Sequence, residues 1–188
     1  MRNLTFYCVG LLMILIQTNF YRFLGPLHDI TLGESIGARH WLHGATPNLV
    51  LPLIIFLGVH EHSMARGALL AAAFGYTLDI MSAAPMFLFT FVSVAIWWLS
   101  RVAGVRLTAQ TFMTRAPLAF GFAIVESAIV LTLLAIFGTD NFRPLELATI
   151  VAPRATATAL VAPLIFRFAH RVHLSTLPSR AAGEVSTG

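Results

Sequence analysis

The stretch FGYTLDIMSAAP, residues 74–85, places one carboxylate, Asp79, near the end of a long apolar run. The nearest basic residues along the chain are Arg66 and Arg101, so no neighbour in sequence balances this charge. A carboxylate in contact with hydrocarbon is costly, and Asp79 must therefore either face away from lipid or serve a specific role.

The residues before Asp79 favour the first alternative. Residues four positions apart share one face of an α-helix. Counting back in fours from Asp79 gives a stripe of small residues: Gly75, Ala71 and Gly67. Such stripes let helix backbones approach closely in membranes, so this face is predicted to lie in a helix–helix seam. Ser82 is then a candidate cap and Pro85 begins the next helix, whose N-terminus stabilises the charge. We interpret Asp79 as a structural carboxylate that fixes this turn, with ligand binding as the alternative.

The composition is that of an integral membrane protein. Of the 188 residues, 57% are hydrophobic and 11% are charged, and the mean hydropathy is +0.81. Soluble domains carry about 25% charged residues, so the bilayer is expected to surround nearly the whole chain. Every basic residue is Arg, and these lie between apolar runs instead of forming a patch, which argues against nucleic acid as a partner. A single cysteine, Cys8, excludes an internal disulfide.

The fold class predicted from this pattern is all-α: a compact bundle of six transmembrane helices in one domain, residues 1–173. The tail, residues 174–188, is expected to be disordered. In the second segment, Thr46 is the expected N-cap and Pro47 the first helical residue. The six apolar segments cover residues 4–24, 46–60, 64–82, 85–100, 116–138 and 145–169.

The arginines predict the orientation of these spans. With the N-terminus inside, eight arginines fall in cytoplasmic segments and three in outer segments, which agrees with the positive-inside rule. Both termini are therefore expected to be cytoplasmic, in a bacterial inner membrane. The basic turn between the fourth and fifth spans is expected to face cytoplasmic partners or anionic lipid: Arg101, Arg106 and Arg115.

Two further charges are predicted to meet at mid-membrane. Glu126 lies about 15 Å from the inner end of the fifth span, and Arg154 about 14 Å from the outer end of the sixth. Across a hydrocarbon core of about 30 Å these depths coincide, and we predict an intramembrane salt bridge. Thr156 and Thr158 are candidates to complete its hydrogen bonds. A structural lock is the main interpretation, and a proton relay or substrate site is the alternative.

The chain has no motif that indicates catalysis. The triplet HEH, residues 60–62, has the residue types of a metal site, but it lies in a tight turn without further ligands nearby. A nucleophile motif, a phosphate-binding glycine loop and HExxH are all absent from the sequence. We therefore expect neither an enzyme nor a protein with a metal or cofactor.

Residues 46–101 resemble the rod shape-determining protein MreD family. That family has Pro-Asp/Asn-Leu-Leu-x-Pro at the second span, and Gly-x-x-x-Asp-hydrophobic-x-Ser-x-x-Pro at the end of the third. The family often has a glycine soon after the last proline, where this chain has Met86 and Phe87. The matching positions here are Pro47, Asn48, Leu49 and Pro52, followed by Gly75, Asp79, Ser82 and Pro85.

The resemblance implies a non-enzymatic subunit of the bacterial cell-elongation complex. Its partners would be MreC, the actin-like MreB machinery, and RodA with a class B penicillin-binding protein. The fold would be similar to the substrate-binding subunit of energy-coupling factor transporters. A vitamin-type subunit of such a transporter is the main alternative, although the first span, with VGLLMILIQTN, lacks the alanine-rich face used there for docking. The third hypothesis is a proton-coupled carrier that uses Asp79, Glu126 and Arg154.

Overall fold

A computed structural model describes residues 2–31, 46–60, 63–82, 85–106, 112–137 and 148–175, with the side chains of α1 described for residues 5–19. Within these ranges the protein is all-helical and has no strand, so the predicted all-α class is confirmed. Each helix corresponds, in order, to one predicted apolar segment. The helices are α1 (Arg2–Thr31), α3 (Val50–His60), α4 (Met64–Met81), α5 (Leu88–Arg106), α6 (Phe112–Phe137) and α8 (Val151–Ser175).

Several helix ends differ from the predicted ones. Helix α1 continues to Thr31 instead of ending at residue 24, and α8 continues to Ser175. Helix α5 begins at Leu88 and not at Pro85, because Phe87 has φ 67°, in the left-handed region that an α-helix excludes. The amide of Leu88 donates to the carbonyl of Pro85 at 3.2 Å and closes the turn. The predicted outer segment beyond Thr31 and the tail beyond Ser175 lie outside the described residues.

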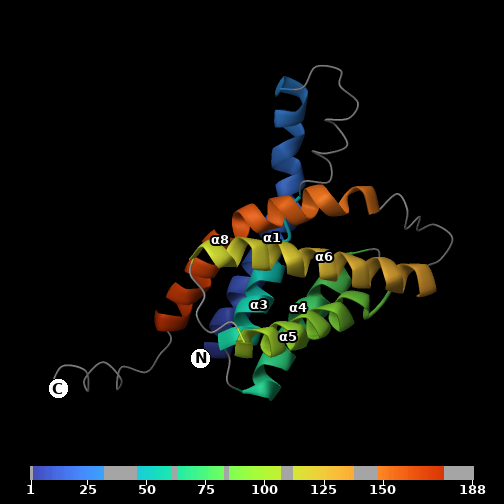
Figure 1. The fold of residues 1–188 in the computed structure, drawn as a ribbon. Coiled ribbons are helices and arrows are strands. Elements are labelled where there is room, and N and C mark those ends of the chain that lie inside the picture. Colours follow the sequence, from blue (N-terminus) through green and yellow to red (C-terminus); the bar gives the residue numbers. More distant parts are fainter. Residues whose placement is uncertain are drawn as a thin grey trace.

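Helix α3 is the centre of the fold. It contacts the other five helices of the described residues and lies between the α4–α5 pair and the α6–α8 pair (Figure 1). Every residue from Val50 to Gly58 is buried, as expected for a segment that is apolar on all sides. Its 11 residues are about 16 Å long, roughly half of a bilayer core. A helix this short, surrounded by others, has its N-terminus inside the bundle.

Glycines bring α5 close to its neighbours on two sides. A Cβ on Gly58 of α3 would collide with Ser100, and a Cβ on Gly67 of α4 would lie 2.6 Å from Trp97 Nε1. A Cβ on Gly75 would lie 2.5 Å from the carbonyl oxygen of Phe89. The absence of a side chain at these positions therefore sets the distance between α5 and both α3 and α4.

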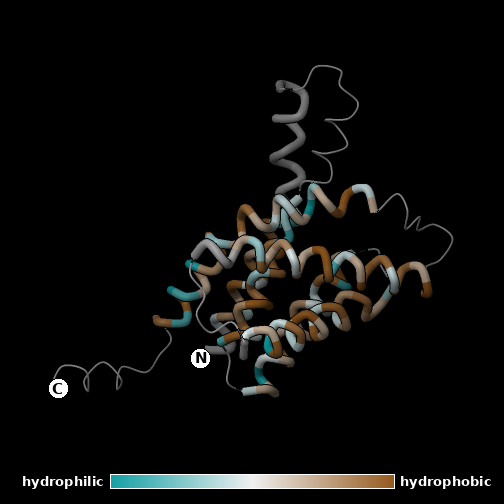
Figure 2. The backbone as a smooth tube through the Cα atoms, viewed as in Figure 1, coloured by the Kyte–Doolittle hydropathy of each residue, from teal (hydrophilic) through white to brown (hydrophobic). Residues whose placement is uncertain are grey.

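One helical segment among the described residues, Ala116–Phe137, is long enough and apolar enough to cross a membrane. Its mean hydropathy is 2.3. Shorter apolar helices run over Thr5–Asn19, Val50–His60 and Leu88–Gly104. Figure 2 shows hydrophobic residues along most of the bundle, and hydrophilic ones gathered in the C-terminal part of α8.

Candidate functional site

The N-terminus of α3 is capped by a side chain inside the bundle. Asn48 Oδ1 accepts hydrogen bonds from the amides of Val50 and Leu51, both at 3.2 Å. The predicted cap, Thr46 followed by Pro47, is therefore wrong, and the helix begins at Val50. The physical reason is that one amide oxygen at Asn48 satisfies two of the four N–H groups that a helix leaves without partners.

The amides of the two residues just before the helix also donate to side chains. The amide of Asn48 donates to Thr158 Oγ1 at 2.9 Å, and that of Leu49 donates to Gln17 Oε1 at 3.0 Å. The hydroxyl of Thr158 donates in turn to the carbonyl of Arg154 at 2.8 Å. All four amides from Asn48 to Leu51 are thus satisfied by side chains, two of them from α1 and α8. The N-terminus of α3 is thereby hydrogen-bonded to both α1 and α8.

The carboxylate of Glu126 holds the Asn48 side chain in place. Asn48 Nδ2 donates to Glu126 Oε1 at 2.8 Å and to Oε2 at 3.0 Å, and both residues are buried. Glu126 lies near the middle of Ala116–Phe137, so the contact is far from either end of that segment. With its amide group directed to Glu126, Asn48 has its oxygen directed toward α3. We call Gln17, Asn48, Glu126 and Thr158 the Asn48 cluster.

The predicted direct salt bridge between Glu126 and Arg154 is not formed between these two described residues. Arg154 lies near the carboxylate and attracts it electrostatically, but its guanidinium does not contact it directly. Asn48 occupies the contact because its amide both donates and accepts, and can join the carboxylate to a helix N-terminus. Arginine only donates and cannot cap those amides. The predicted common depth of the two charges agrees with their positions around one cavity.

A cavity of about 370 Å³ opens beside the Asn48 cluster. Its walls come from α1, α4, α5, α6, α8 and the segment before α3. This volume lies within the range of about 300–1,000 Å³ that is usual for small-molecule sites. The described residues contain no group of His, Cys, Asp or Glu that fits a metal ion. The polar lining residues include Gln17, Thr18, Asn48, Ser82, Glu126 and Arg154.

Asp79 caps α5. Its Oδ1 accepts from the amide of Phe89 at 2.8 Å, and its Oδ2 accepts from the amide of Thr90 at 3.0 Å and from Thr90 Oγ1 at 2.6 Å. The charge therefore lies at the positive end of a helix dipole. Ser82 is the residue that follows the C-terminus of α4, and its hydroxyl lies 3.5 Å from the carbonyl oxygen of Asp79. The carboxylate joins two consecutive helices across their turn.

The small-residue stripe lies on the face of α4 that meets α5. Gly67 and Gly75 approach α5 as described above, and Ala71 is fully buried. Trp97 Nε1, next to Gly67, is a buried donor with no partner among the described residues. The stripe and Asp79 thus form one continuous contact with α5.

The predicted basic turn is described only in part. Arg101 lies in α5 with its guanidinium carbon 5.9 Å from the centre of the Trp97 ring, a cation–π contact. Arg106 ends α5 and Arg115 lies in the first part of α6, but their side chains fall outside the described residues. Of the HEH triplet, only His60 is described, and its ring stacks on Phe56 at 4.1 Å.

Two features of the site are not apparent from sequence reasoning. Gln17 lies in the first apolar run, and nothing in its spacing relates it to Leu49. Asn48 was identified through the family motif alone, and its bond to Glu126 spans 78 positions of the chain. A polar residue at the start of a short, wholly apolar segment is the signal that could have identified Asn48.

Comparisons with protein-family models, with curated proteins and with solved structures gave no match to this chain.

Replacing Asp79 with Ala is expected to lower the free energy of unfolding by about 2 kcal/mol, because two amides and a hydroxyl lose their acceptor. Asp79→Asn keeps one acceptor oxygen, so about half of that loss is expected. The measurement is thermal unfolding of detergent-solubilised protein, in which size-exclusion chromatography gives the folded fraction that remains after heating. Ser82→Ala is the control, with an effect within about 0.5 kcal/mol. Equal stability of Asp79→Ala and Ser82→Ala would contradict the assigned role.

Proposed function

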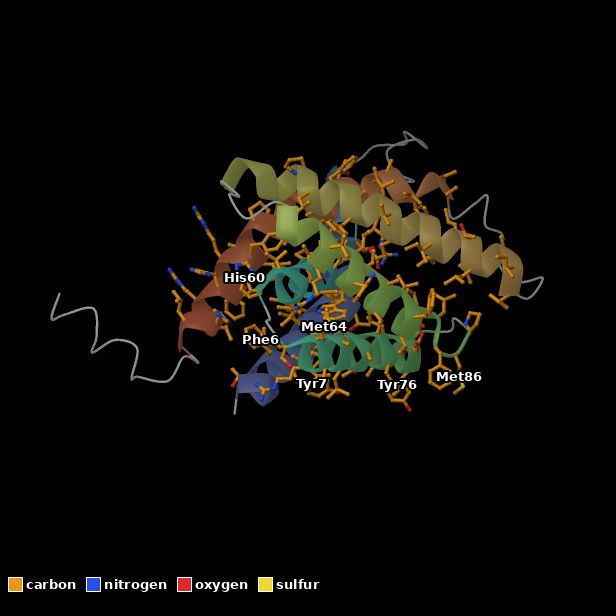
Figure 3. The ribbon with its side chains drawn as sticks, turned by 60° about the horizontal axis from the view of Figure 1, so that its bottom comes forward. Phe6, Tyr7, His60, Met64, Tyr76 and Met86 are labelled. Carbon is orange, nitrogen blue, oxygen red and sulfur yellow. The ribbon has the colours of Figure 1, made fainter. Side chains whose placement is uncertain are left out.

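We propose that this protein is a multi-pass membrane protein and that the six helices described above all lie in the bilayer. Asn48, Glu126 and Thr158 are buried, whereas large apolar side chains are exposed, among them Leu69 at 71% and Leu160 at 82%. Tyr76 and Met86 also project away from the bundle (Figure 3). This distribution suits hydrocarbon surroundings, since monomeric soluble proteins rarely expose large contiguous apolar patches.

The short helix α3 fits the same proposal. Backbone amides inside a membrane must be satisfied within the protein, and a helix that begins inside a bundle is tolerated only where neighbours satisfy its end. The Asn48 cluster satisfies these amides. The acceptors for these amides are Asn48 itself and two side chains from α1 and α8, so the helix end needs no solvent.

We propose further that the protein is a non-enzymatic subunit of the bacterial cell-elongation complex, as the resemblance to the MreD family suggests. The observation that carries this proposal is the use of two of the polar motif residues, Asn48 and Asp79. Each caps a helix inside the bundle, so the motif serves architecture. A rigid membrane scaffold for MreC, the MreB machinery, and RodA with its penicillin-binding protein requires such a framework and no catalytic group.

Deletion of the gene in its rod-shaped host tests this role. We expect the cells to round, and co-purification from native membranes to recover MreC. The matched control is complementation by the intact gene and by a variant with Gly121→Ala, since Gly121 has open space around it. A clean deletion that leaves normal rods would contradict the proposal.

One observation favours a second candidate, the vitamin-type subunit of an energy-coupling factor transporter. The polar cavity of about 370 Å³ has room for a small molecule and offers both a carboxylate and a guanidinium. Native mass spectrometry of the purified protein distinguishes the two candidates. A tightly bound small molecule together with a co-purified energising ATPase would favour the transporter over the scaffold.

The proposed topology has both termini in the cytoplasm. A green fluorescent protein fused after residue 188 is expected to fluoresce, and alkaline phosphatase inserted after Arg39 is expected to be active. The basis is the arginine distribution, eight inside against three outside. The reverse pattern, an active phosphatase at the C-terminus with a dark fluorescent fusion, would exclude this orientation.

A further inference from the structure

A groove of about 550 Å³ lies between α1 and α8, apart from the Asn48 cluster. Helix α1 lines it with four apolar residues at positions i, i+3, i+4 and i+7: Val9, Leu12, Met13 and Ile16. Met13 is buried and forms part of the floor, whereas Leu12 and Ile16 are about half exposed at the rim. Among the described helices, only α8 shares the lining of this groove with α1.

Helix α8 lines the opposite side with both apolar and basic residues. Leu164 and Phe168 are exposed at the rim, and Ile165 is buried beside them. Arg167 and Arg171 continue this face toward the C-terminus of the helix. Leu164 and Arg171 are seven residues apart, about 10 Å along the axis. The groove is therefore apolar at one end and basic at the other.

The charge at the basic end is of one sign. None of the described residues that line the groove is acidic. Arg167 and Arg171 are one helical turn apart, so their two positive charges lie on the same face of α8. Guanidinium groups donate paired hydrogen bonds that match the oxygens of a phosphate, which makes two of them a suitable phosphate site.

The two ends of the groove together match one class of ligand. A phospholipid has a phosphate headgroup at the membrane surface and acyl chains toward the membrane centre. In the proposed topology α8 runs inward, so Arg171 lies nearest the cytoplasmic surface and Leu164 nearer the centre. Hydrophilic residues gather in this part of α8 in Figure 2. A transmembrane helix of a partner protein would instead cover two arginines with apolar side chains, at a cost in desolvation.

We propose that the groove between α1 and α8 binds one anionic phospholipid of the cytoplasmic leaflet. The acyl chain lies along the apolar residues of both helices, and the headgroup phosphate lies between Arg167 and Arg171. This inference rests on the proposed membrane location but not on the role in cell elongation. Loss of lipid binding and loss of cell shape are therefore separate measurements.

Native mass spectrometry of the full chain, titrated with dioleoyl phosphatidylglycerol or dioleoyl phosphatidylcholine, tests the proposal. We expect the anionic lipid to bind more tightly. Arg171→Gln is expected to weaken its binding about fivefold, the equivalent of about 1 kcal/mol for one basic residue at a membrane surface. Arg167→Gln with Arg171→Gln is expected to weaken it about 25-fold. Arg66→Gln is the matched control, since Arg66 is exposed on α4 outside the groove.

A second variant tests the apolar end without a change in charge. Leu164→Trp adds bulk at the rim and is expected to weaken binding of both lipids. Each variant is accepted only when its size-exclusion profile matches the unmodified protein. Equal affinity for the two lipids, or an equal loss in Arg66→Gln and Arg171→Gln, would overturn the proposal. So would a photo-crosslinker at Leu164 that captures a protein helix in native membranes instead of lipid.

Discussion

Asn48→Ala is expected to lower the free energy of unfolding by about 3–5 kcal/mol. The change removes the acceptor for the amides of Val50 and Leu51, and it leaves the buried carboxylate of Glu126 without its donor. Each buried amide left unpaired costs about 1–3 kcal/mol, and a lost bond to a charged group adds a similar amount. Because α3 contacts every other helix, the loss affects the centre of the bundle.

A pair of substitutions separates this mechanism from simple loss of volume. Asn48→Asp keeps an acceptor for α3 but places two carboxylates at hydrogen-bond distance, and strong destabilisation is expected. Adding Glu126→Gln restores an amide donor, now on α6, and reverses the direction of the same bond. We expect a coupling free energy of unfolding of about 1–3 kcal/mol between positions 48 and 126. The double variant is then more stable than Asn48→Asp alone.

Thermal unfolding of the four proteins in detergent gives the comparison, with Thr46→Ala as the control. Thr46 lies two residues away and makes no capping bond among the described contacts, so its replacement is expected to leave the melting temperature nearly unchanged. Additive effects of Asn48→Asp and Glu126→Gln would contradict the role assigned to Glu126. A folded Glu126→Gln variant that still maintains rod shape would also argue against a proton carrier.

The sequence predicts the helices well because each apolar run is bounded by polar or turn residues. It also predicts the seam, since residues four apart share a helix face whatever the neighbours are. The sequence does not predict the partner of Glu126. Depth along a helix can be counted, but rotation about the helix axis cannot, and Arg154 and Asn48 are both near the correct level. Which of them contacts the carboxylate depends on packing among four segments distant in sequence.

The helix starts illustrate a second limit. Thr46 and Pro47 form a good local start signal, and Pro85 is equally plausible as the first residue of its helix. Asn48 overrides the first signal because Glu126 and Thr158 hold it in place. Phe87 moves the second start to Leu88 through its left-handed backbone. The MreD family, which this stretch resembles, often has a glycine soon after the final proline of its motif, and glycine adopts such a backbone without strain.

Gly75→Ala is expected to destabilise the protein by about 3 kcal/mol, the upper end of the usual cost of overpacking. A Cβ at this position would lie 2.5 Å from the carbonyl oxygen of Phe89 and from the Cα of Thr90. Both atoms belong to the backbone of α5 at the turn held by Asp79, so neither moves aside without breaking the cap. Gly121→Ala is the matched control, because no described atom beyond its chain neighbours and its own helix backbone lies within 4 Å of the added Cβ.

The two substitutions add the same methyl group to a helix, and alanine favours helix over glycine by about 1 kcal/mol. Helix propensity alone therefore predicts stabilisation at both positions. The contact of α4 with α5 predicts opposite signs: a lower melting temperature for Gly75→Ala and an equal or higher one for Gly121→Ala. Equal shifts in both variants, measured by thermal unfolding in detergent, would mean that the small-residue stripe does not set the distance between these helices. A lower melting temperature in Gly75→Ala alone would support a single contact that includes both Gly75 and Asp79. In that contact, the close approach of α4 and α5 brings the amides of α5 within reach of the carboxylate.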